Sequence, residues 1–269
     1  MRTNHVKAAL RAGRASIGTW LSLPDPFAAG FLAPAGFDWL NVDMEHSPTN
    51  WETAALIFAA VARGGAVPLI RVPWNSGENI KRALDNGAWG IVVPMVNSRA
   101  EAEAAVAAAT YPLRGNRSVG GGLHALGFET DSATYYSRAD DEILVVIQAE
   151  HIQAVEQADD ILSVPGIDAV FIGPNDLSAS MGIPPAMESD DPRVVEAIDH
   201  VRKTAQKHNV APGIHVGSAA AANQRLEEGF RFIALASELR LMQAAAQSEL
   251  AALKWEPNRG VADGEAARY

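Results

Sequence analysis

The chain has 269 residues, of which 48% are hydrophobic, and its formal net charge is −10. A chain of this length can bury a large core, and its scattered acidic charge disfavours nucleic acid or an anionic membrane as a partner, which leaves small molecules. The absence of cysteine excludes disulfides, thiolate zinc sites and a cysteine nucleophile, and it fits a reducing cytoplasm.

The N-terminal segment 1–13 is basic, but no long apolar run follows it. Neither a signal peptide nor a membrane span is therefore predicted, and we expect a soluble intracellular protein.

Beyond this segment, short apolar runs alternate with stretches of helical spacing. The runs that predict strands are Ser16–Leu21, Asp38–Val42, Val67–Val72, Gly90–Val93, Ile143–Ala149, Asp168–Ile172, Ala211–Val216 and Phe230–Leu235. The predicted helices are Pro26–Pro34, Asn50–Arg63, Ser76–Asn86, Ser98–Ala109, His151–Ser163, Pro192–His208, Ser218–Glu228 and Glu238–Leu253. Such alternation is typical of a parallel sheet covered on both faces, and eight units in roughly 250 residues predict an α/β fold, a closed (β/α)₈ TIM barrel. An open doubly wound sheet is the competing arrangement.

Two segments fall outside this alternation. Segment 111–141 contains five glycines and exceeds an ordinary connection, so we expect an active-site loop with a short helix there. Segment 256–269 is polar and is expected to be a mobile tail or an arm onto a neighbour. No break in composition marks a second domain, so residues 1–255 are predicted to form a single barrel domain.

Two carboxylates stand where predicted strands end, which is where a barrel of this kind places its active site. Glu150 follows the fifth strand in Gln148-Ala149-Glu150, and Asp176 follows the sixth in Gly173-Pro174-Asn175-Asp176. Carboxylate oxygens suit Mg²⁺ or Mn²⁺, which usually keep open positions for water and substrate. Either carboxylate alone is better explained as a helix cap, but two at one barrel mouth favour a metal site.

A histidine and an arginine follow neighbouring strands. His46 can act as a base because an unperturbed imidazole exchanges its proton near neutrality, although a single loop histidine is more often structural. Its rival His151 should point away from the neighbouring carboxylate. Arg71 ends the third strand. Its guanidinium has two interpretations that the sequence supports equally: an ion pair with Asp43 or Glu45, or a site that binds a carboxylate or a developing oxyanion.

The sequence lacks the residues that several other catalytic mechanisms and cofactors require. The five lysines lie on the N-terminal segment, on predicted helices or near the chain end, so a Schiff-base mechanism has no obvious nucleophile. The segment Gly115–Gly122 lacks the Gly-Lys-Ser/Thr of a phosphate-binding loop, and no dinucleotide fingerprint is present. Neither pyridoxal phosphate nor NAD is expected.

Taken together, these motifs resemble the metal-dependent (class II) pyruvate aldolases of the HpcH/HpaI aldolase family over about Val6 to Leu253. The motifs that carry the resemblance are Gly36-Phe37-Asp38-Trp39-Leu40, Asp43-Met44-Glu45-His46, Arg71-Val72-Pro73, Val93-Pro94-Met95-Val96, Tyr111-Pro112-Leu113-Arg114-Gly115, Gln148-Ala149-Glu150 and Phe171-Ile172-Gly173-Pro174-Asn175-Asp176-Leu177-Ser178.

The resemblance implies a barrel of the phosphoenolpyruvate/pyruvate type, assembled as a homohexamer, a trimer of dimers that exchange C-terminal helices. It implies Mg²⁺, Mn²⁺ or Co²⁺ on Glu150 and Asp176, and a 2-oxo acid beside Arg71. Further 2-oxo acid contacts are implied for Gln148, Gly173, Pro174 and Asn175. His46 is implied as the base with Asp85 as its acidic partner, and Arg71 as the cation that steadies the enolate and the aldol oxyanion.

The implied reaction is the reversible cleavage of 4-hydroxy-2-oxo acids to pyruvate, or hydroxypyruvate, and an aldehyde. Two alternatives remain open. One is an acyl-CoA lyase like the related citrate lyase β and malyl-CoA lyase group, although no basic platform for the nucleotide is evident. The other is a non-enzymatic barrel with a structural ion, for which three or more protein ligands are expected.

Three positions depart from the family pattern. His124 lies in the loop where members commonly carry Ala-Arg-Ala, and no arginine is near it in that stretch. His215 stands where an apolar residue is usual, and Glu238 replaces the usual Asp. We therefore expect a changed acceptor pocket, involving His124 and His215, on an unchanged metal centre.

Overall fold

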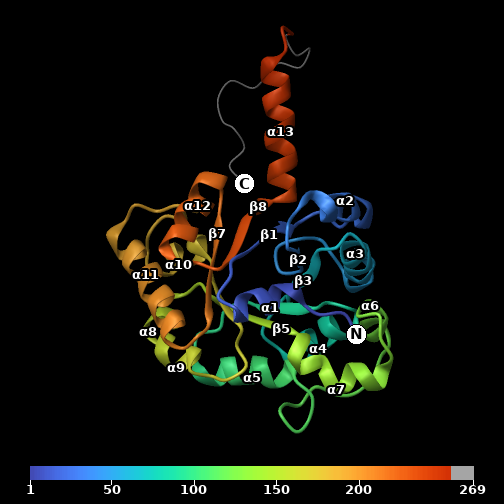
Figure 1. Cartoon of the computed structure of the whole chain (residues 1–269). Helices are drawn as coiled ribbons and strands as arrows, with labels where there is room; N and C mark the ends of the chain where they lie inside the picture. The colour runs from blue at the N-terminus through green and yellow to red at the C-terminus, as the bar shows by residue number, and fades with distance from the viewer. Residues whose placement is uncertain (256–269) are drawn as a thin grey trace.

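The predicted strands close into one parallel barrel. The structure is a computed structural model that describes residues 1–255. Around the barrel the strands follow chain order, and β8 pairs with β1 to close it (Figure 1). The strands are β1 (Ser16–Leu21), β2 (Trp39–Asp43), β3 (Val67–Arg71), β4 (Gly90–Val93), β5 (Leu144–Ala149), β6 (Ala169–Ile172), β7 (Ala211–Val216) and β8 (Phe232–Ser237). The predicted (β/α)₈ barrel is confirmed, and the open sheet is excluded.

Helices cover the outside of this barrel. They are α1 (His5–Arg11), α2 (Pro26–Leu32), α3 (Trp51–Arg63), α4 (Gly77–Asp85), α5 (Arg99–Ala109), α6 (Leu123–Gly127), α7 (Ser132–Glu142), α8 (Ile152–Glu156), α9 (Ala158–Leu162), α10 (Pro174–Ser180), α11 (Pro192–Lys207), α12 (Ala219–Glu228) and α13 (Glu238–Ala252). The helix predicted over His151–Ser163 is two helices, divided at Gln157. Helices α1 and α10 were not predicted, and α6 and α7 stand where one short helix was expected.

Local sequence explains where individual helices begin. The Ser98 hydroxyl accepts a hydrogen bond from the Glu101 amide, and the Glu101 carboxylate accepts one from the Asn97 amide at 2.7 Å. The first bond satisfies a backbone donor that a helix start leaves unpaired, and the second ties the Glu101 side chain to the residue before the cap, so α5 begins directly after Ser98, where the predicted helix starts.

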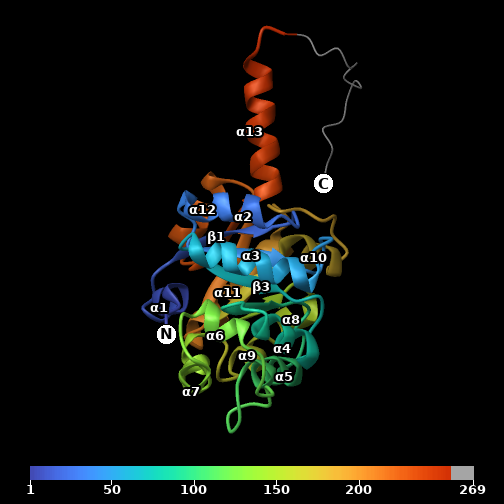
Figure 2. The ribbon, with the colours of Figure 1, turned by 90° about the vertical axis from the view of Figure 1, so that its right-hand side faces the viewer.

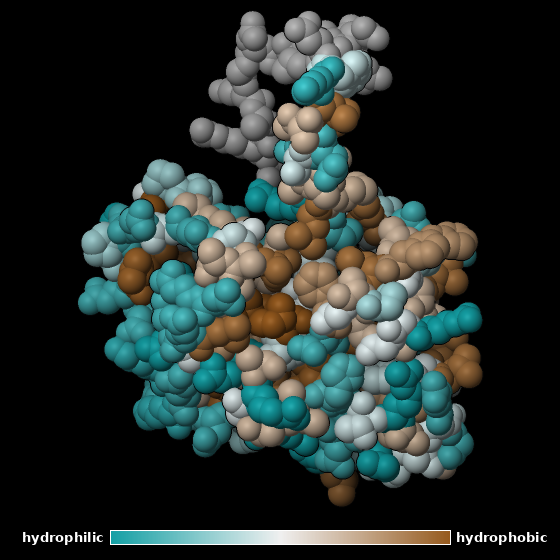
Figure 3. Space-filling model, turned by 45° about the horizontal axis from the view of Figure 1, so that its top comes forward, coloured by the Kyte–Doolittle hydropathy of each residue, from teal (hydrophilic) through white to brown (hydrophobic). Residues whose placement is uncertain are grey.

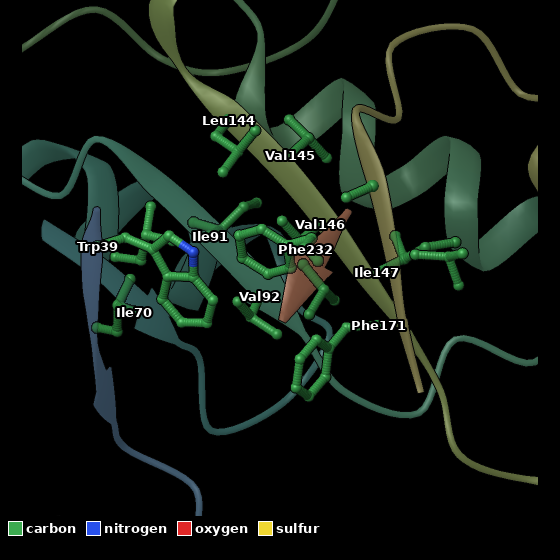
Figure 4. Close-up of a cluster of buried hydrophobic side chains, with 14 of the residues drawn as sticks. Trp39, Ile70, Ile91, Val92, Leu144, Val145, Val146, Ile147, Phe171 and Phe232 are labelled. Atoms are coloured by element: carbon green, nitrogen blue, oxygen red, sulfur yellow. The ribbon is translucent and has the colours of Figure 1, made fainter. Parts of the chain in front are cut away.

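Aromatic rings fill the middle of the barrel (Figure 4). Trp39 stacks on Phe232 at 4.3 Å between ring centroids, Phe232 meets the edge of Phe171 at 6.0 Å, and Phe171 meets Trp20 at 5.6 Å. Gly18 permits this packing, because a Cβ there would lie 2.0 Å from the Trp39 ring. The four rings form a column, here called the ring column, that ends at the Trp20 side chain near the C-terminal end of β1.

The N-terminal end of the barrel is closed by α1. The Lys7 ammonium lies 3.0 Å from the Asp168 carboxylate and donates to the Ile143 carbonyl, at the starts of β5 and β6. Burial lowers the pKa of Lys7, while Asp168 opposes that shift. A buried ion pair thus fixes α1 at the end of the barrel opposite to the C-terminal strand ends.

Segment 111–141 also lies at the N-terminal end. It follows α5, which runs antiparallel to the strands, and it contains α6 and all but the last residue of α7 before the chain enters β5. The expectation of an active-site loop is therefore wrong for the chain's own barrel mouth. A sequence segment that follows a helix, rather than a strand, emerges at the end away from the site.

Helix α13 projects from the barrel in both side views (Figures 1 and 2). None of its 15 residues is buried, and Met242 and Leu250 are exposed by more than half. The predicted polar tail, Glu256–Tyr269, lies outside the described residues. None of the described helices combines the length and hydropathy that crossing a membrane requires.

Candidate active site

A cavity of about 240 Å³ opens at the C-terminal strand ends. Seen from this end, hydrophobic side chains gather beneath the projecting α13 with hydrophilic ones around them (Figure 3). The predicted site residues that line the cavity are Asp43, His46, Arg71, Gln148, Glu150, Gly173, Pro174, Asn175, Asp176 and His215. A larger cavity of about 510 Å³ beside α3 and α6 contains none of these residues and has no pair of carboxylates, so the smaller cavity is the candidate site.

Glu150 is a buried carboxylate at the base of this cavity. Its two oxygens accept hydrogen bonds from the Met95 amide and from the Gln148 side chain, both at 2.8 Å. Burial raises the pKa of Glu150 to about 7; the Met95 amide and Arg71 oppose the shift, while the charges of Glu45 and Asp176 add to it. Burial and the neighbouring carboxylates disfavour the charged form of Glu150. A cation bound among these acids would offset that cost.

Neither member of the carboxylate pair caps a helix. The N-cap of α10 is Gly173, with Asp176 two residues inside the helix, and the N-cap of α8 is His151. The side chain of His151 accepts the Gln153 amide, so this rival histidine is engaged in capping. The helix-cap interpretation of Glu150 and Asp176 is therefore wrong.

The donor set fits a hard divalent cation. Glu150 and Asp176 offer oxygens, and the Gln148 amide oxygen is buried without a hydrogen-bond partner among the described residues. Within residues 1–255 no cluster of three or more His, Cys, Asp or Glu side chains could hold an ion. Two carboxylates leave coordination positions for water and substrate, which disfavours the closed structural site that a scaffold barrel would need.

Gly173 keeps space beside this pair. A Cβ there would lie 2.9 Å from the Glu150 Oε2 atom and 3.1 Å from the Glu150 Cβ atom. We expect Gly173→Ala to displace the Glu150 carboxylate and weaken Mn²⁺ binding by at least about tenfold, because misplaced ligands lose coordination energy. Isothermal titration with Mn²⁺ measures this. The control is Gly217→Ala, where a Cβ would meet its nearest atoms at 3.8 Å. Equal Mn²⁺ affinity in both variants would contradict the role of Gly173 in keeping space for Glu150.

Arg71 is held by two carboxylates. Its guanidinium binds Asp43 through two hydrogen bonds of 2.9 and 2.7 Å, and a third nitrogen lies 3.0 Å from Glu45. Burial opposes ionisation of Asp43, but the Arg71 guanidinium holds the pKa of that carboxyl below its usual value. Both interpretations of Arg71 are consistent with this geometry, since the ion pair fixes a cation whose side chain still lines the cavity.

His46 lies at the rim of the cavity. The Asp43 carboxylate accepts the His46 amide at 3.2 Å, and the His46 Nε2 atom is 3.9 Å from Glu45. Its side chain is 65% exposed. The imidazole therefore reaches both the cavity and solvent, as a base that exchanges protons with water requires.

Asp85 does not meet His46 within the chain. It ends α4, a helix about 13 Å long that runs from the C-terminal to the N-terminal end of the barrel. There the Asp85 carboxylate accepts a hydrogen bond of 2.8 Å from Arg117, whose side chain is fully buried. The expected pairing of His46 with Asp85 is wrong within one protomer, because the two residues lie at opposite ends of the barrel.

His124 is likewise remote from the cavity. It is fully buried in α6, with its ring 4.2 Å from that of Tyr135. Burial, and then the charge of Arg117, lower the pKa of His124. The expected role of His124 in the acceptor pocket is wrong for its own barrel. His215, the other departure, does line the cavity.

Sequence analysis missed part of the lining. The additional residues are Trp20, Ser22, Phe171, Met187, Ser237 and Arg240. Applying the strand-end rule to β1 and β8 would have found Ser22 and Ser237, since they follow or end those strands. The Glu238 carboxylate accepts the Leu23 amide at 2.6 Å, so this departure from the family pattern secures the β1 loop.

Comparison with known proteins adds a sequence relationship to this geometry. Residues 16–245 match the family described as HpcH/HpaI aldolase/citrate lyase. A hydroxypyruvate/pyruvate aldolase from Rhizorhabdus wittichii is 38% identical over 248 residues, which cover 92% of this chain and 98% of that protein. A 4-hydroxy-2-oxo-heptane-1,7-dioate aldolase from Escherichia coli is 39% identical over 91% of this chain and 93% of that protein. The crystal structure of a family protein from Burkholderia cenocepacia has a TM-score of 0.86 at 34% identity, covering 93% of this chain and 98% of that one.

Proposed function

The chain belongs to the HpcH/HpaI aldolase/citrate lyase family, and from that premise we propose a metal-dependent aldolase. It cleaves 4-hydroxy-2-oxo acids reversibly to pyruvate or hydroxypyruvate and an aldehyde. The names of its relatives favour an aldolase over the acyl-CoA lyase alternative. The observation that carries the proposal is the buried Glu150 beside Asp176 and Arg71 at the barrel mouth.

The carboxylate pair is assigned to metal binding. Glu150 and Asp176 would hold Mg²⁺, Mn²⁺ or Co²⁺, with Gln148 and the Gly173–Asp176 turn lining the 2-oxo acid. When bound, such a cation polarises the keto group of the substrate and stabilises negative charge on its oxygen. Arg71 adds a fixed positive charge whose guanidinium is already oriented by Asp43.

In cleavage, His46 takes the proton of the 4-hydroxyl group, directly or through a water. The C3–C4 bond then breaks, its electron pair passes into the enolate of the 2-oxo acid, and the aldehyde forms at C4. Protonation of C3 completes the reaction, and addition reverses these steps. Positioned proton transfer of this kind contributes about 10² to 10⁴-fold to rate.

Asp85 can assist His46 only from a neighbouring protomer, because the two residues of one chain lie at opposite ends of the barrel. The proposed homohexamer would supply such a neighbour, and the projecting α13 with its exposed Met242 and Leu250 supports an assembly of this kind. A carboxylate brought against His46 would raise its basicity and fix its tautomer. We place the enzyme in the cytoplasm, which the absence of cysteine supports.

A substrate panel with metal removal tests the proposed function. We expect release of pyruvate or hydroxypyruvate from 4-hydroxy-2-oxo acids, loss of at least about 99% of the rate after EDTA treatment, and recovery with Mg²⁺, Mn²⁺ or Co²⁺. A lactate dehydrogenase-coupled assay follows pyruvate, and direct chromatography follows hydroxypyruvate.

Borohydride with substrate is the control for a Schiff base, which it would trap irreversibly. Cleavage that persists in EDTA, or inactivation by borohydride plus substrate, contradicts the metal-dependent mechanism. Cleavage of malyl-CoA in place of 4-hydroxy-2-oxo acids would favour the acyl-CoA lyase.

A further inference from the structure

His215 brings an oriented imidazole into the cavity wall from β7. Its Nε2 atom lies 3.0 Å from the carbonyl oxygen of Ala236. Since a carbonyl oxygen only accepts, Nε2 must carry the proton and donate it. In the neutral ring, the other nitrogen, Nδ1, is then a hydrogen-bond acceptor.

A β-bulge fixes this orientation. The pairing of β1 with β8 shifts register between Gly18 and Trp20, and Ala236 has a φ of +51°. The Thr19 hydroxyl donates to the Leu235 carbonyl at 2.7 Å, and His215 donates to the next carbonyl, that of Ala236. Because side chains satisfy both carbonyls of the bulge, the tautomer of His215 is set by the backbone of β8.

The surroundings keep the imidazole neutral. Burial lowers the pKa of His215 to about 4; the cations Arg71 and Arg240 lower it further, while the bond to Ala236 and the charge of Asp43 oppose the shift. Within the described residues 1–255, the His215 Nδ1 atom makes no hydrogen bond. It is also not one of the fully buried polar atoms that lack a partner, so it is accessible. It remains available to a ligand in the cavity.

His215 shares a wall with Arg71. The Trp20 indole contacts both of them, with the Arg71 guanidinium carbon 4.6 Å and the His215 ring centroid 5.9 Å from its ring centroid. An aldehyde whose carbonyl oxygen points to Arg71 would direct its next carbon atoms along this indole. A hydroxyl group on that carbon would face a hydrogen-bond acceptor at His215.

We propose that His215 Nδ1 determines acceptor specificity by accepting a hydrogen bond from a hydroxyl group beside the aldehyde carbonyl. The enzyme then prefers 2-hydroxyaldehydes to analogues that lack the hydroxyl. A site built to bind a substrate hydroxyl disfavours the analogue without it, because the acceptor is left unpaired. This inference rests on the proposed aldolase function, since the reacting aldehyde places the hydroxyl.

The test compares two aldehydes of similar size, glycolaldehyde and propanal, in addition to pyruvate with Mn²⁺ present. Intrinsic reactivity cancels when the ratio of their kcat/KM values is compared between protein variants. We expect His215→Leu to lower the glycolaldehyde-to-propanal ratio about tenfold. His215→Gln should restore the ratio to within about threefold of wild type, since an amide can donate to Ala236 and accept the hydroxyl.

The outcomes separate this inference from the proposed function. An unchanged ratio in His215→Leu, or failure of His215→Gln to restore it, overturns the specificity role, since a structural role affects both aldehydes alike. If His215→Leu does not fold, His215→Phe retains the ring volume and gives the same comparison. If the wild-type protein adds pyruvate to neither aldehyde, the proposed aldolase function itself is overturned. Exchange of the pyruvate methyl protons for deuterium in D₂O shows separately whether the protein still forms the enolate.

Discussion

Glu150→Gln is expected to lower kcat/KM for cleavage of a 4-hydroxy-2-oxo acid by at least about 10³-fold. Glutamine keeps the size of the side chain and its acceptor for the Met95 amide, but it removes the charge that would hold a divalent cation. Losing several kcal/mol of charge stabilisation corresponds to a factor of this size. Steady-state kinetics at saturating Mn²⁺ measure the loss, and isothermal titration should show that Mn²⁺ binding falls with it.

Stability provides the control for Glu150→Gln. In the metal-free protein the pKa of Glu150 is about 7, above the ordinary 4.5, so the folded state holds the proton more tightly than the unfolded state between these pH values. The stabilisation associated with protonated Glu150 is present below pH 4.5 and is lost as pH rises through 7. Glutamine does not titrate, so in EDTA at pH 8 the variant should match or exceed wild type, by up to about 3 kcal/mol in free energy of unfolding. Turnover near wild type with Mn²⁺ binding intact would contradict the assignment.

Arg71→Lys is expected to lower kcat/KM by roughly 10² to 10³-fold, although it retains a positive charge. Lysine cannot form the paired hydrogen bonds that orient Arg71 on Asp43, so its ammonium is not fixed where the enolate and aldol oxygens develop charge. The measurement is the kcat and KM of cleavage, with thermal denaturation to establish that the variant is folded.

Arg99→Lys is the matched control for this substitution. Arg99 pairs with Glu103 at 2.7 Å on the exposed face of α5, outside the cavity, and its replacement should leave kcat/KM within about twofold, since exposed pairs contribute little. A folded Arg71→Lys protein with the turnover of Arg99→Lys would reduce Arg71 to a structural partner of Asp43.

The barrel could be predicted because the strands are short, mainly apolar runs without regular polar alternation, separated by stretches of helical spacing. The runs ending at Ala149 and Ile172 placed Glu150 and Asp176 at the same end of the sheet, and the structure brings both to one cavity. Chain direction alone sufficed for this, since parallel strands end together. The family predicted from the motifs is confirmed by the comparisons, and the similar relatives are named as aldolases.

Two predicted site residues, Asp85 and His124, do not line the cavity of their own barrel, and the cause is different. Asp85 and His124 were assigned from motif position, but both follow or lie in helices that return to the N-terminal end of the barrel. The hydrogen bond of Asp85 to Arg117 joins residues 32 positions apart in the sequence, which no local pattern specifies. The bond of His215 to Ala236 depends on a bulge in β8 that the apolar run does not reveal.

The ring column divides the interior of the barrel into two parts with different tolerance of mutation. Trp39, Phe232 and Phe171 pack on one another in the core, and truncating such a ring to alanine costs about 3 to 5 kcal/mol, a large part of a domain's net stability. At the rim, Ser22 has no ring, and His215 contacts only the last ring of the column, that of Trp20. Selection can therefore change which aldehydes are used by altering the rim, while substitutions that deepen the cavity into the column would be removed first by their effect on folding.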